Sequence, residues 1–134
     1  MAYLLDSNIC IYAMAGRHPQ VLQRMQKAGK QALCVDAIVV SELAFGVAKS
    51  DPSFQARNKL QLQKFLGCVT VLEWPSAAMW TYGQIRNMLR VSGQPIGELD
   101  LLIGAHALHA GLIVVTNNTR EFERIEGLKL ENWV

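Results

Sequence analysis

Short apolar runs alternate along the chain with longer stretches whose apolar residues recur at helical spacing, and this alternation predicts a sheet covered by helices. The apolar runs predict short strands over 2–6, 32–36, 68–72, 112–116 and 128–130. The stretches between them predict helices over 7–16, 18–29, 37–49, 52–66, 75–91 and 98–110, and a helical turn over 121–125. Strands that are separated by helices need right-handed crossovers, so we expect an α/β domain with a mainly parallel sheet of four to five strands.

Residues at the ends and on the faces of these helices refine the prediction. Ser7 or Asn8 is expected to cap the first helix, because a short polar side chain can accept a hydrogen bond from a free N-terminal N–H. Apolar spacing also predicts core positions on the second and fourth helices, namely Val21, Leu22 and Met25, and Leu60, Leu62 and Phe65.

Three carboxylates interrupt stretches that are otherwise apolar: Asp6, Glu42 and Asp100. Each stretch would bury well without its acid, and an ionised carboxylate in such surroundings is costly unless something compensates its charge. Taken singly, Asp6 could be a helix cap, Glu42 could pair with a basic side chain, and Asp100 could be a first-turn acid. Taken together, the economical explanation is that all three converge on one bound cation.

Polar residues follow the first and fourth predicted strands directly. Asp6 ends the first strand, and Asn117 and Asn118 follow the fourth. Because ligands of parallel sheets bind beyond the carboxyl ends of the strands, these residues are expected to lie at one edge of the sheet, where a metal site should be.

The remaining acids suggest solvated charges. Asp36 and Glu73 end apolar runs and are interpreted as surface turn residues, and Glu98 as a helix-start acid that the helix dipole favours. A further group lies in the polar C-terminal stretch and is given no chemistry: Glu121, Glu123, Glu126 and Glu131.

Composition limits the class of protein. The 134 residues are expected to form one domain, 1–134, and with 51% hydrophobic and 18% charged residues the chain is more apolar than an average soluble domain. This excess suggests a buried parallel sheet, a subunit interface, or both. A net charge of +2 gives no strong basic field, although it leaves room for a local phosphate-binding rim.

The sequence predicts a cytoplasmic protein without a membrane segment. Its apolar runs are shorter than the roughly 20 residues needed to cross a bilayer, and it begins without a secretory signal pattern. Cys10, Cys34 and Cys68 are odd in number and widely spaced, so we expect buried reduced thiols and no disulfide framework.

Four blocks of the sequence resemble PIN-domain ribonucleases, in the order found in that family. The first is Leu-Asp-Ser-Asn at 5–8, and the second is Ser-Glu-Leu at 41–43 with a glycine at 46. The blocks 95–107 and 112–122 are especially similar to the VapC toxins of bacterial type II toxin–antitoxin systems. The resemblance spans the whole chain.

This resemblance implies a three-layer α/β/α PIN-like fold and a Mg²⁺-dependent endoribonuclease toxin, with Mn²⁺ able to substitute. It implies a VapB antitoxin as the neutralising partner, and a homodimer within larger toxin–antitoxin assemblies. The substrate it implies is RNA, in many relatives transfer RNA cut in the anticodon stem-loop, and in the most similar VapC proteins the initiator transfer RNA.

The same resemblance assigns roles to individual residues. Asp6 and Asp100 are expected to bind the metal directly, and Glu42 to bind a metal-held water, to orient the nucleophile, or to contact the ion when substrate is present. Hydrolysis assisted by such an ion should leave a 5′-phosphate and a 3′-hydroxyl. Asn118 and Arg120 are expected to contact the substrate.

One departure from the family pattern leaves an alternative open. Asn117 and Asn118 stand where many PIN domains have a fourth acid, which favours one tightly held ion and keeps a catalytically silent RNA- or protein-binding PIN module as the alternative. A receiver domain is disfavoured, because its phosphoacceptor aspartate and lysine are not evident. His106, His109 and Trp80 are interpreted as core, surface or subunit-contact residues, and Arg86 and Arg90 as solvated helix charges able to contact phosphates.

Overall fold

Five parallel strands form one sheet in the computed structural model of the chain, which describes residues 2–134. The strand order is β3-β2-β1-β4-β5. The strands are β1 (Tyr3–Leu5), β2 (Leu33–Asp36), β3 (Thr70–Leu72), β4 (Ile113–Val115) and β5 (Lys129–Glu131). The predicted α/β class and the mainly parallel sheet are therefore confirmed, and the short fifth strand is present.

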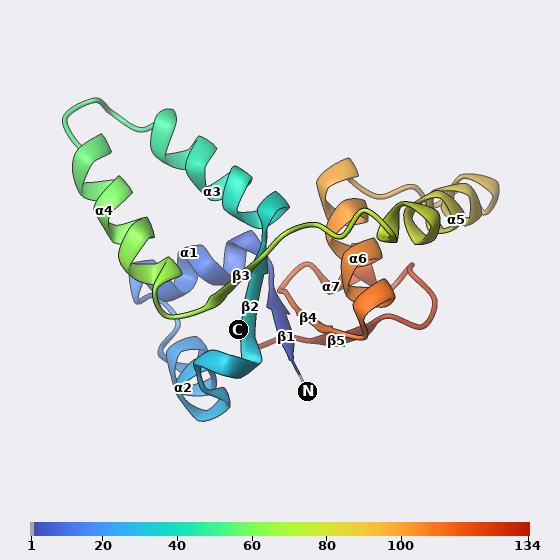
Figure 1. Ribbon diagram of the computed structural model, residues 1–134, viewed down its shortest axis with the longest axis horizontal. Helices are drawn as coiled ribbons and strands as arrows, with labels where there is room; N and C mark the ends of the chain where they lie inside the picture. The colour runs from blue at the N-terminus through green and yellow to red at the C-terminus, as the bar shows by residue number, and fades with distance from the viewer. Residues whose placement is uncertain (1) are drawn as a thin grey trace.

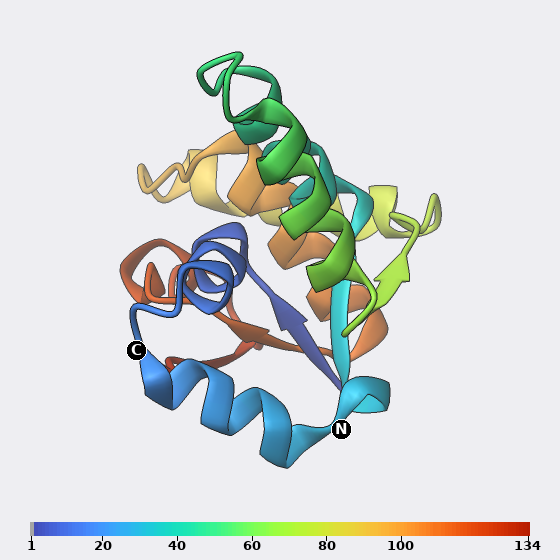
Figure 2. The same ribbon diagram turned by 90° about the vertical axis from the view of Figure 1, so that its left-hand side faces the viewer.

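Helices cover both faces of this sheet (Figures 1 and 2). They are α1 (Ser7–Ala15), α2 (Pro19–Ala28), α3 (Ala37–Ala48), α4 (Gln55–Leu66), α5 (Ala78–Val91), α6 (Glu98–Ala110) and α7 (Thr119–Phe122), with a 3-10 turn at Lys30–Ala32. In Figure 1, α1 to α4 lie to the left of the strands and α5 and α6 to the right. This division follows from right-handed crossovers, because the chain first moves outward from β1 to β3 and then returns across β1 to β4.

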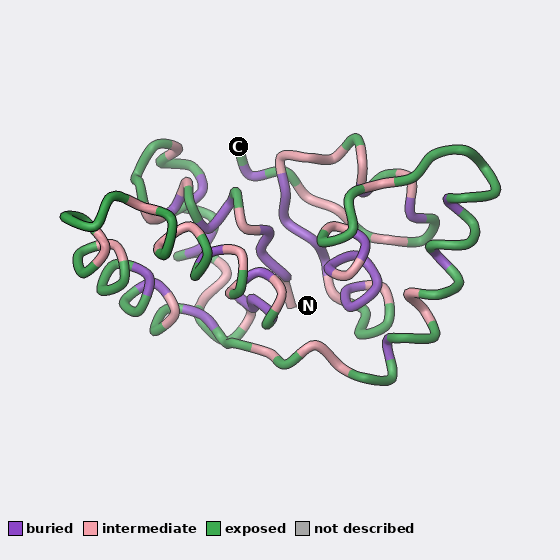
Figure 3. The backbone as a smooth tube through the Cα atoms, turned by 90° about the horizontal axis from the view of Figure 1, so that it is seen from above, coloured by how far each residue is buried: buried purple, intermediate pink, exposed green. Residues whose placement is uncertain are grey.

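The core lies along the central strands and the inner helix faces (Figure 3). Leu4, Leu5, Val114 and Val115 are completely buried because β1 and β4 are flanked by strands and covered on both faces. Continuous apolar runs of this kind are typical of parallel sheets.

The predicted core positions of α2 and α4 are only partly correct. Val21, Met25, Leu62 and Phe65 are buried, whereas Leu22 is 39% exposed and Leu60 is 52% exposed. Both helices lie on the outside of the domain, so only a narrow stripe of each faces the core, and these two leucines lie beside that stripe. Among residues 2–134, no helix combines the length and the apolarity needed to span a bilayer.

The strand order reverses between β1 and β4, and this is the position where open α/β sheets bind ligands. Leu5 pairs with Val115, so the residues that follow each strand emerge side by side. The Asp6 N–H continues the ladder by donating to the Val115 carbonyl at 3.0 Å. Asp6 and the segment that begins at Thr116 therefore share one edge of the sheet.

Asp36 is a buried residue, and its interpretation as a surface turn residue is wrong. Its side chain is completely buried at the end of β2, where Oδ1 accepts from the Val39 N–H at 2.9 Å and caps α3. Its Oδ2 lies 2.8 Å from Nδ1 of His106, which is itself buried in α6. This pair links helices on the two faces of the sheet, and the sequence pattern gave no sign of it.

Two smaller expectations are also corrected. The residue that caps α1 is Asp6, whose side chain accepts from the Ser7 N–H, and neither Ser7 nor Asn8 has this role. Cys10 and Cys34 are buried free thiols as predicted, but Cys68 is exposed because it precedes the edge strand β3.

We expect the Asp36→Ala variant to lose about 2–4 kcal/mol of unfolding free energy, since it removes a helix cap and leaves the buried His106 imidazole without its partner. Urea unfolding measures this loss. Asp36→Asn is the matched control, because its amide keeps an oxygen for the cap and a polar group toward His106. A wild-type unfolding curve for Asp36→Ala would show that the pair does not stabilise the fold.

Candidate active site

Asp6 is held rigidly at the start of α1. Its Oδ1 accepts from the Ser7 N–H at 2.6 Å and from the Ser7 hydroxyl at 3.3 Å, and its Oδ2 accepts from the Thr116 hydroxyl at 2.7 Å. Only 3% of the residue is exposed. Burial raises the pKa of Asp6, and the hydrogen bonds from Thr116 and Ser7 act in the opposite direction. Neutral donors thus orient the carboxylate without cancelling its charge.

Asp100 lies in the first turn of α6, where Asn118 links it to Glu121. The Asn118 amide donates to Asp100 Oδ2 and to Glu121 Oε2, both at 3.1 Å. The Asn118 backbone N–H in turn donates to the Thr116 hydroxyl at 2.9 Å. One chain of hydrogen bonds therefore runs from Asp6 through Thr116 and Asn118 to Asp100.

Glu121 belongs to this cluster, so its interpretation as a solvated charge is wrong. The short helix α7 carries its side chain back to Asn118 and Asp100. The spacing of apolar residues gives no information about a polar segment, so it could not predict that the Glu121 side chain contacts Asn118. The only signal in the sequence is an acid three residues after Asn118.

Glu42 approaches from α3, on the other face of the sheet from Asp100. Burial raises the pKa of Glu42, the charges of Asp6 and Asp36 raise it further, and a hydrogen bond from Ser7 lowers it. The three acids that interrupt apolar stretches therefore lie near enough to act on one another electrostatically.

The acids of this edge act on one another electrostatically. Burial, hydrogen bonding to Glu121 and the charges of Asp6, Glu121 and Glu42 raise the pKa of Asp100 to about 8. Hydrogen bonding with Asp100 lowers the pKa of Glu121. Among residues 2–134, ion pairs join only Arg24 to Glu131 and Asp36 to His106. The alternative in which Glu42 pairs with a basic side chain is therefore not what the described residues show.

This donor set has the chemistry of a hard divalent cation site. Its ligands would be carboxylate oxygens, which Mg²⁺ prefers, and within residues 2–134 none of Asp6, Glu42 and Asp100 forms an ion pair with a basic side chain. No three His, Cys, Asp or Glu side chains of the described part of the chain converge closely enough to enclose an ion by themselves. An ion that keeps several of its waters, as Mg²⁺ does, needs fewer direct protein ligands than an enclosing cluster would supply.

The residues around the carboxylates differ in their contacts. Arg120 is exposed on α7, next to Asn118, and makes no hydrogen bond or ion pair within the described residues. Asn117 donates to the Tyr12 hydroxyl at 3.0 Å, while its own Oδ1 is buried without a partner among residues 2–134. Asn117 thus holds α1 against the end of β4 and does more than complete a turn.

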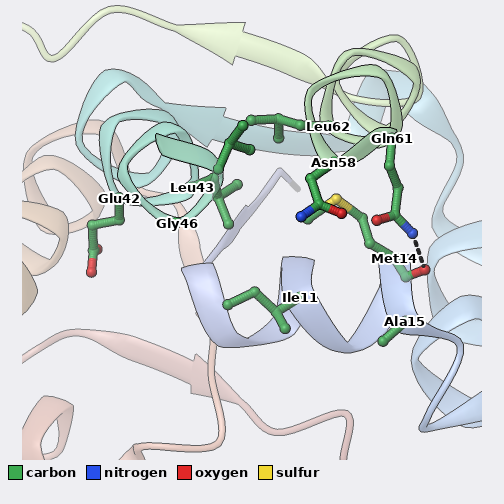
Figure 4. A pocket seen from close by; sticks show the side chains of 10 residues that line it. Ile11, Met14, Ala15, Glu42, Leu43, Gly46, Asn58, Gln61 and Leu62 are labelled. Carbon is green, nitrogen blue, oxygen red and sulfur yellow. Dashed lines mark hydrogen bonds between the residues drawn. The ribbon is translucent and has the colours of Figure 1, made fainter. Parts of the chain in front are cut away.

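An apolar cavity of about 300 Å³ opens beside Glu42, between α1, α3 and α4 (Figure 4). Ile11, Met14, Leu43 and Leu62 contribute apolar side chains to it. Figure 4 shows Glu42 extending from α3 on the side away from Met14, so that the apolar surface borders the acidic edge.

Comparison with known proteins identifies the family. The PIN domain model matches residues 3–128. The chain belongs to the PIN-domain family. Within it, the chain is 42% identical over 135 residues to ribonuclease VapC2 of Haemophilus influenzae, covering 100% of this chain and 99% of that protein. It is 39% identical over 134 residues to the tRNA(fMet)-specific endonuclease VapC of Shigella flexneri, covering 99% and 98%. The resemblance to VapC proteins is thus confirmed.

Solved PIN-domain structures agree with this assignment. VapBC2 from Rickettsia felis bound to a promoter DNA fragment matches with a TM-score of 0.92 at 34% identity, covering 100% of both chains. DNA-bound VapBC from Salmonella typhimurium matches with a TM-score of 0.92 at 35% identity, covering 100% of this chain and 99% of that one. The three-layer PIN-like fold expected from the sequence is confirmed.

We expect the metal-free Asp100→Asn variant to be more stable than the wild type at pH 8, by about 1 kcal/mol after allowing for the partial exposure of the site. The folded-state pKa of Asp100 is about 8 and its ordinary value is 3.8, so ionising Asp100 should destabilise the wild type as the pH rises from about 4 to 8. The gain should disappear as the pH falls below 3.8, where Asp100 is protonated in the unfolded state as well.

Thermal unfolding across this pH range measures the effect. Glu98→Gln, which removes an exposed acid two residues earlier on α6, is the matched control. Added Mg²⁺ should raise the melting temperature of the wild type more than that of Asp100→Asn. Equal stability of both proteins at every pH would contradict the unfavourable environment assigned to Asp100.

Proposed function

We propose that this chain is a Mg²⁺-dependent endoribonuclease toxin of the VapC type, which hydrolyses transfer RNA and is neutralised by a VapB antitoxin. The observation that carries the proposal is the group of carboxylates without basic partners at the strand-order reversal of a chain about 40% identical to VapC ribonucleases. The name of the Shigella flexneri relative, a tRNA(fMet)-specific endonuclease, supports initiator transfer RNA as the substrate. The anticodon stem-loop is the proposed place of cleavage.

In the proposed reaction, the protein holds negatively charged carboxylates in fixed positions around the metal ion and the attacking water. Mg²⁺ bound at this edge would polarise the scissile phosphate and stabilise the leaving 3′ oxygen. Asp6 and Asp100 are the proposed direct ligands, because each has a carboxylate oriented by neutral donors. The raised pKa of Glu42 suits a group that orients the attacking water and takes up its proton on a carboxylate oxygen.

Asn118 stands where many PIN domains have a fourth acid, and Glu121 can supply the carboxylate that is missing at that position. Asn118 uses its amide to hold Asp100 and Glu121 together, and Glu121 supplies the additional carboxylate. The acidic edge therefore keeps four carboxylates, which favours an active nuclease over the alternative of a catalytically silent binding module. Arg120, exposed beside Asn118, is proposed to contact an RNA phosphate.

The apolar cavity beside Glu42 is the proposed docking site of the antitoxin. Two solved structures that match the whole chain with a TM-score of 0.92 are VapBC complexes, which supports a VapB partner. A segment that fills the cavity between α1, α3 and α4 would lie next to Glu42 and could block access to the carboxylates.

Purified protein is expected to cleave RNA in Mg²⁺ or Mn²⁺ and to lose this activity in EDTA, leaving 5′-phosphate and 3′-hydroxyl ends. Asp6→Asn should lower kcat by at least about 100-fold, because it removes a charged ligand from the site. Glu123→Gln, an exposed acid outside the cluster, is the control and should cleave normally. Cleavage that survives EDTA, or full activity of Asp6→Asn, would refute metal-dependent hydrolysis.

Expression of the chain alone is expected to stop bacterial growth, and Asp6→Ala or co-expression of the cognate VapB should restore it. Sequencing the 5′ ends of RNA fragments after brief induction should reveal a site in the anticodon loop of initiator transfer RNA. Equal growth defects from wild type and Asp6→Ala would remove the basis of the toxin assignment. If the fragment ends lie in other RNAs, the nuclease assignment stands and the assignment of initiator transfer RNA as the substrate is wrong.

A further inference from the structure

A second cavity, of about 370 Å³, lies between the C-terminal half of α5 and the loop that leads into α6. We call it the α5–α6 pocket; it is lined by Arg86, Leu89, Arg90, Pro95, Ile96, Glu98 and Leu101. Figure 1 shows the loop after α5 returning along that helix to the start of α6. Leu89 and Leu101 are buried, so the pocket combines an apolar wall with exposed charged side chains.

Both arginines of the pocket have neutral hydrogen-bond partners. Arg86 donates to the Tyr82 hydroxyl at 3.0 Å, and Arg90 donates to Asn87 Oδ1 at 2.9 Å. Neither forms an ion pair with a carboxylate within residues 2–134, although Glu98 lines the same pocket. The guanidinium groups are therefore oriented, keep their full charge and retain free N–H donors, as in sites where arginine binds phosphate.

The loop that closes the pocket is fixed by hydrogen bonds. Arg124 donates to the Pro95 carbonyl at 2.8 Å, and the Gln94 N–H donates to the Leu89 carbonyl at 2.9 Å. Gly93 supports the turn after α5 with a φ of 72°, which favours glycine. The pocket is thus already formed before any ligand arrives, which lowers the cost of binding.

The position of the pocket ties it to the candidate active site. The loop that borders the pocket reaches the carboxylates at Gly97, where an added Cβ would lie 3.9 Å from Glu121 Oε2 and 4.0 Å from Asp100 Oδ2. An RNA strand with its scissile phosphate at Asp100 approaches a cluster of carboxylates that repels it. Fixed cationic groups beside the cluster would offset this repulsion.

We propose that the α5–α6 pocket binds a nucleotide of single-stranded RNA adjacent to the cleaved bond, an inference that rests on the proposed ribonuclease function. Arg86 and Arg90 bind its phosphate, and the apolar wall formed by Leu89 and Ile96 packs against its base. The Glu98 carboxylate accepts a hydrogen bond from a base amino group or from a ribose hydroxyl. The pocket thereby contributes to the specificity of the enzyme for single-stranded RNA loops.

The test compares two double variants that lose the same charge from a cation-lined cavity. Arg86→Gln/Arg90→Gln alters the α5–α6 pocket, and Arg57→Gln/Lys64→Gln alters a cavity of about 290 Å³ on α4. The first should raise KM for RNA about tenfold with kcat within about twofold, while the second leaves both unchanged. In the Asp100→Asn background, the first should also weaken binding of a short fluorescent oligoribonucleotide about tenfold and reduce the salt slope by about one.

Each other result overturns the proposal. Equal KM and equal oligoribonucleotide affinity for the two double variants would show that Arg86 and Arg90 are solvated charges that do not bind RNA. A fall in kcat alone would show that they have a role other than substrate binding. A change in molecular mass by light scattering for Arg86→Gln/Arg90→Gln would assign the pocket to a subunit interface. If the wild type cleaves no RNA, the proposed function fails, and the oligoribonucleotide measurement still decides whether the pocket binds RNA.

Discussion

Like-charge repulsion between Asp6, Glu42 and Asp100 is the constraint on which the site depends. Burial raises the pKa of all three, the charge of Asp6 raises the pKa of Glu42 and of Asp100 further, and no basic side chain of residues 2–134 forms an ion pair with them. Neutral donors hold two of these carboxylates in place, through the Thr116 hydroxyl and the Asn118 amide. Because the donors are neutral, the edge keeps the negative charge that a divalent cation needs. A lysine or arginine in their place would neutralise part of this charge and weaken the affinity for a cation.

The geometry of this edge depends on the register of very short strands. β1 and β4 have three residues each, and the pairing of Leu5 with Val115 sets Asp6 beside Thr116. A slip of one residue would turn Asp6 toward the opposite face of the sheet and break its bond to Thr116. The complete burial of Leu4 and Val114 opposes such a slip, because it would expose them or force them against the helices. Packing of the core thus fixes the position of Asp6 relative to Thr116.

The sequence predicted the fold well because the apolar runs and helical stretches are separated by clear breaks. It also singled out Asp6, Glu42 and Asp100, because a charge inside an apolar stretch is visible without a structure. It did not identify Glu121, whose role depends on how the short helix α7 turns back toward Asn118. It also missed the pairing of Asp36 with His106, since contacts between residues 70 positions apart leave no trace in local spacing.

The buried Asp36–His106 pair has a mechanical consequence. Glu42 lies six residues beyond Asp36 along the chain, and Asp100 lies six residues before His106, so each acid is about 9 Å along its helix from the pair. The separation of Glu42 and Asp100 therefore depends on how α3 and α6 are oriented about this buried contact. A tilt of α3 against α6 about this point changes the gap between their acids while the sheet below stays unchanged.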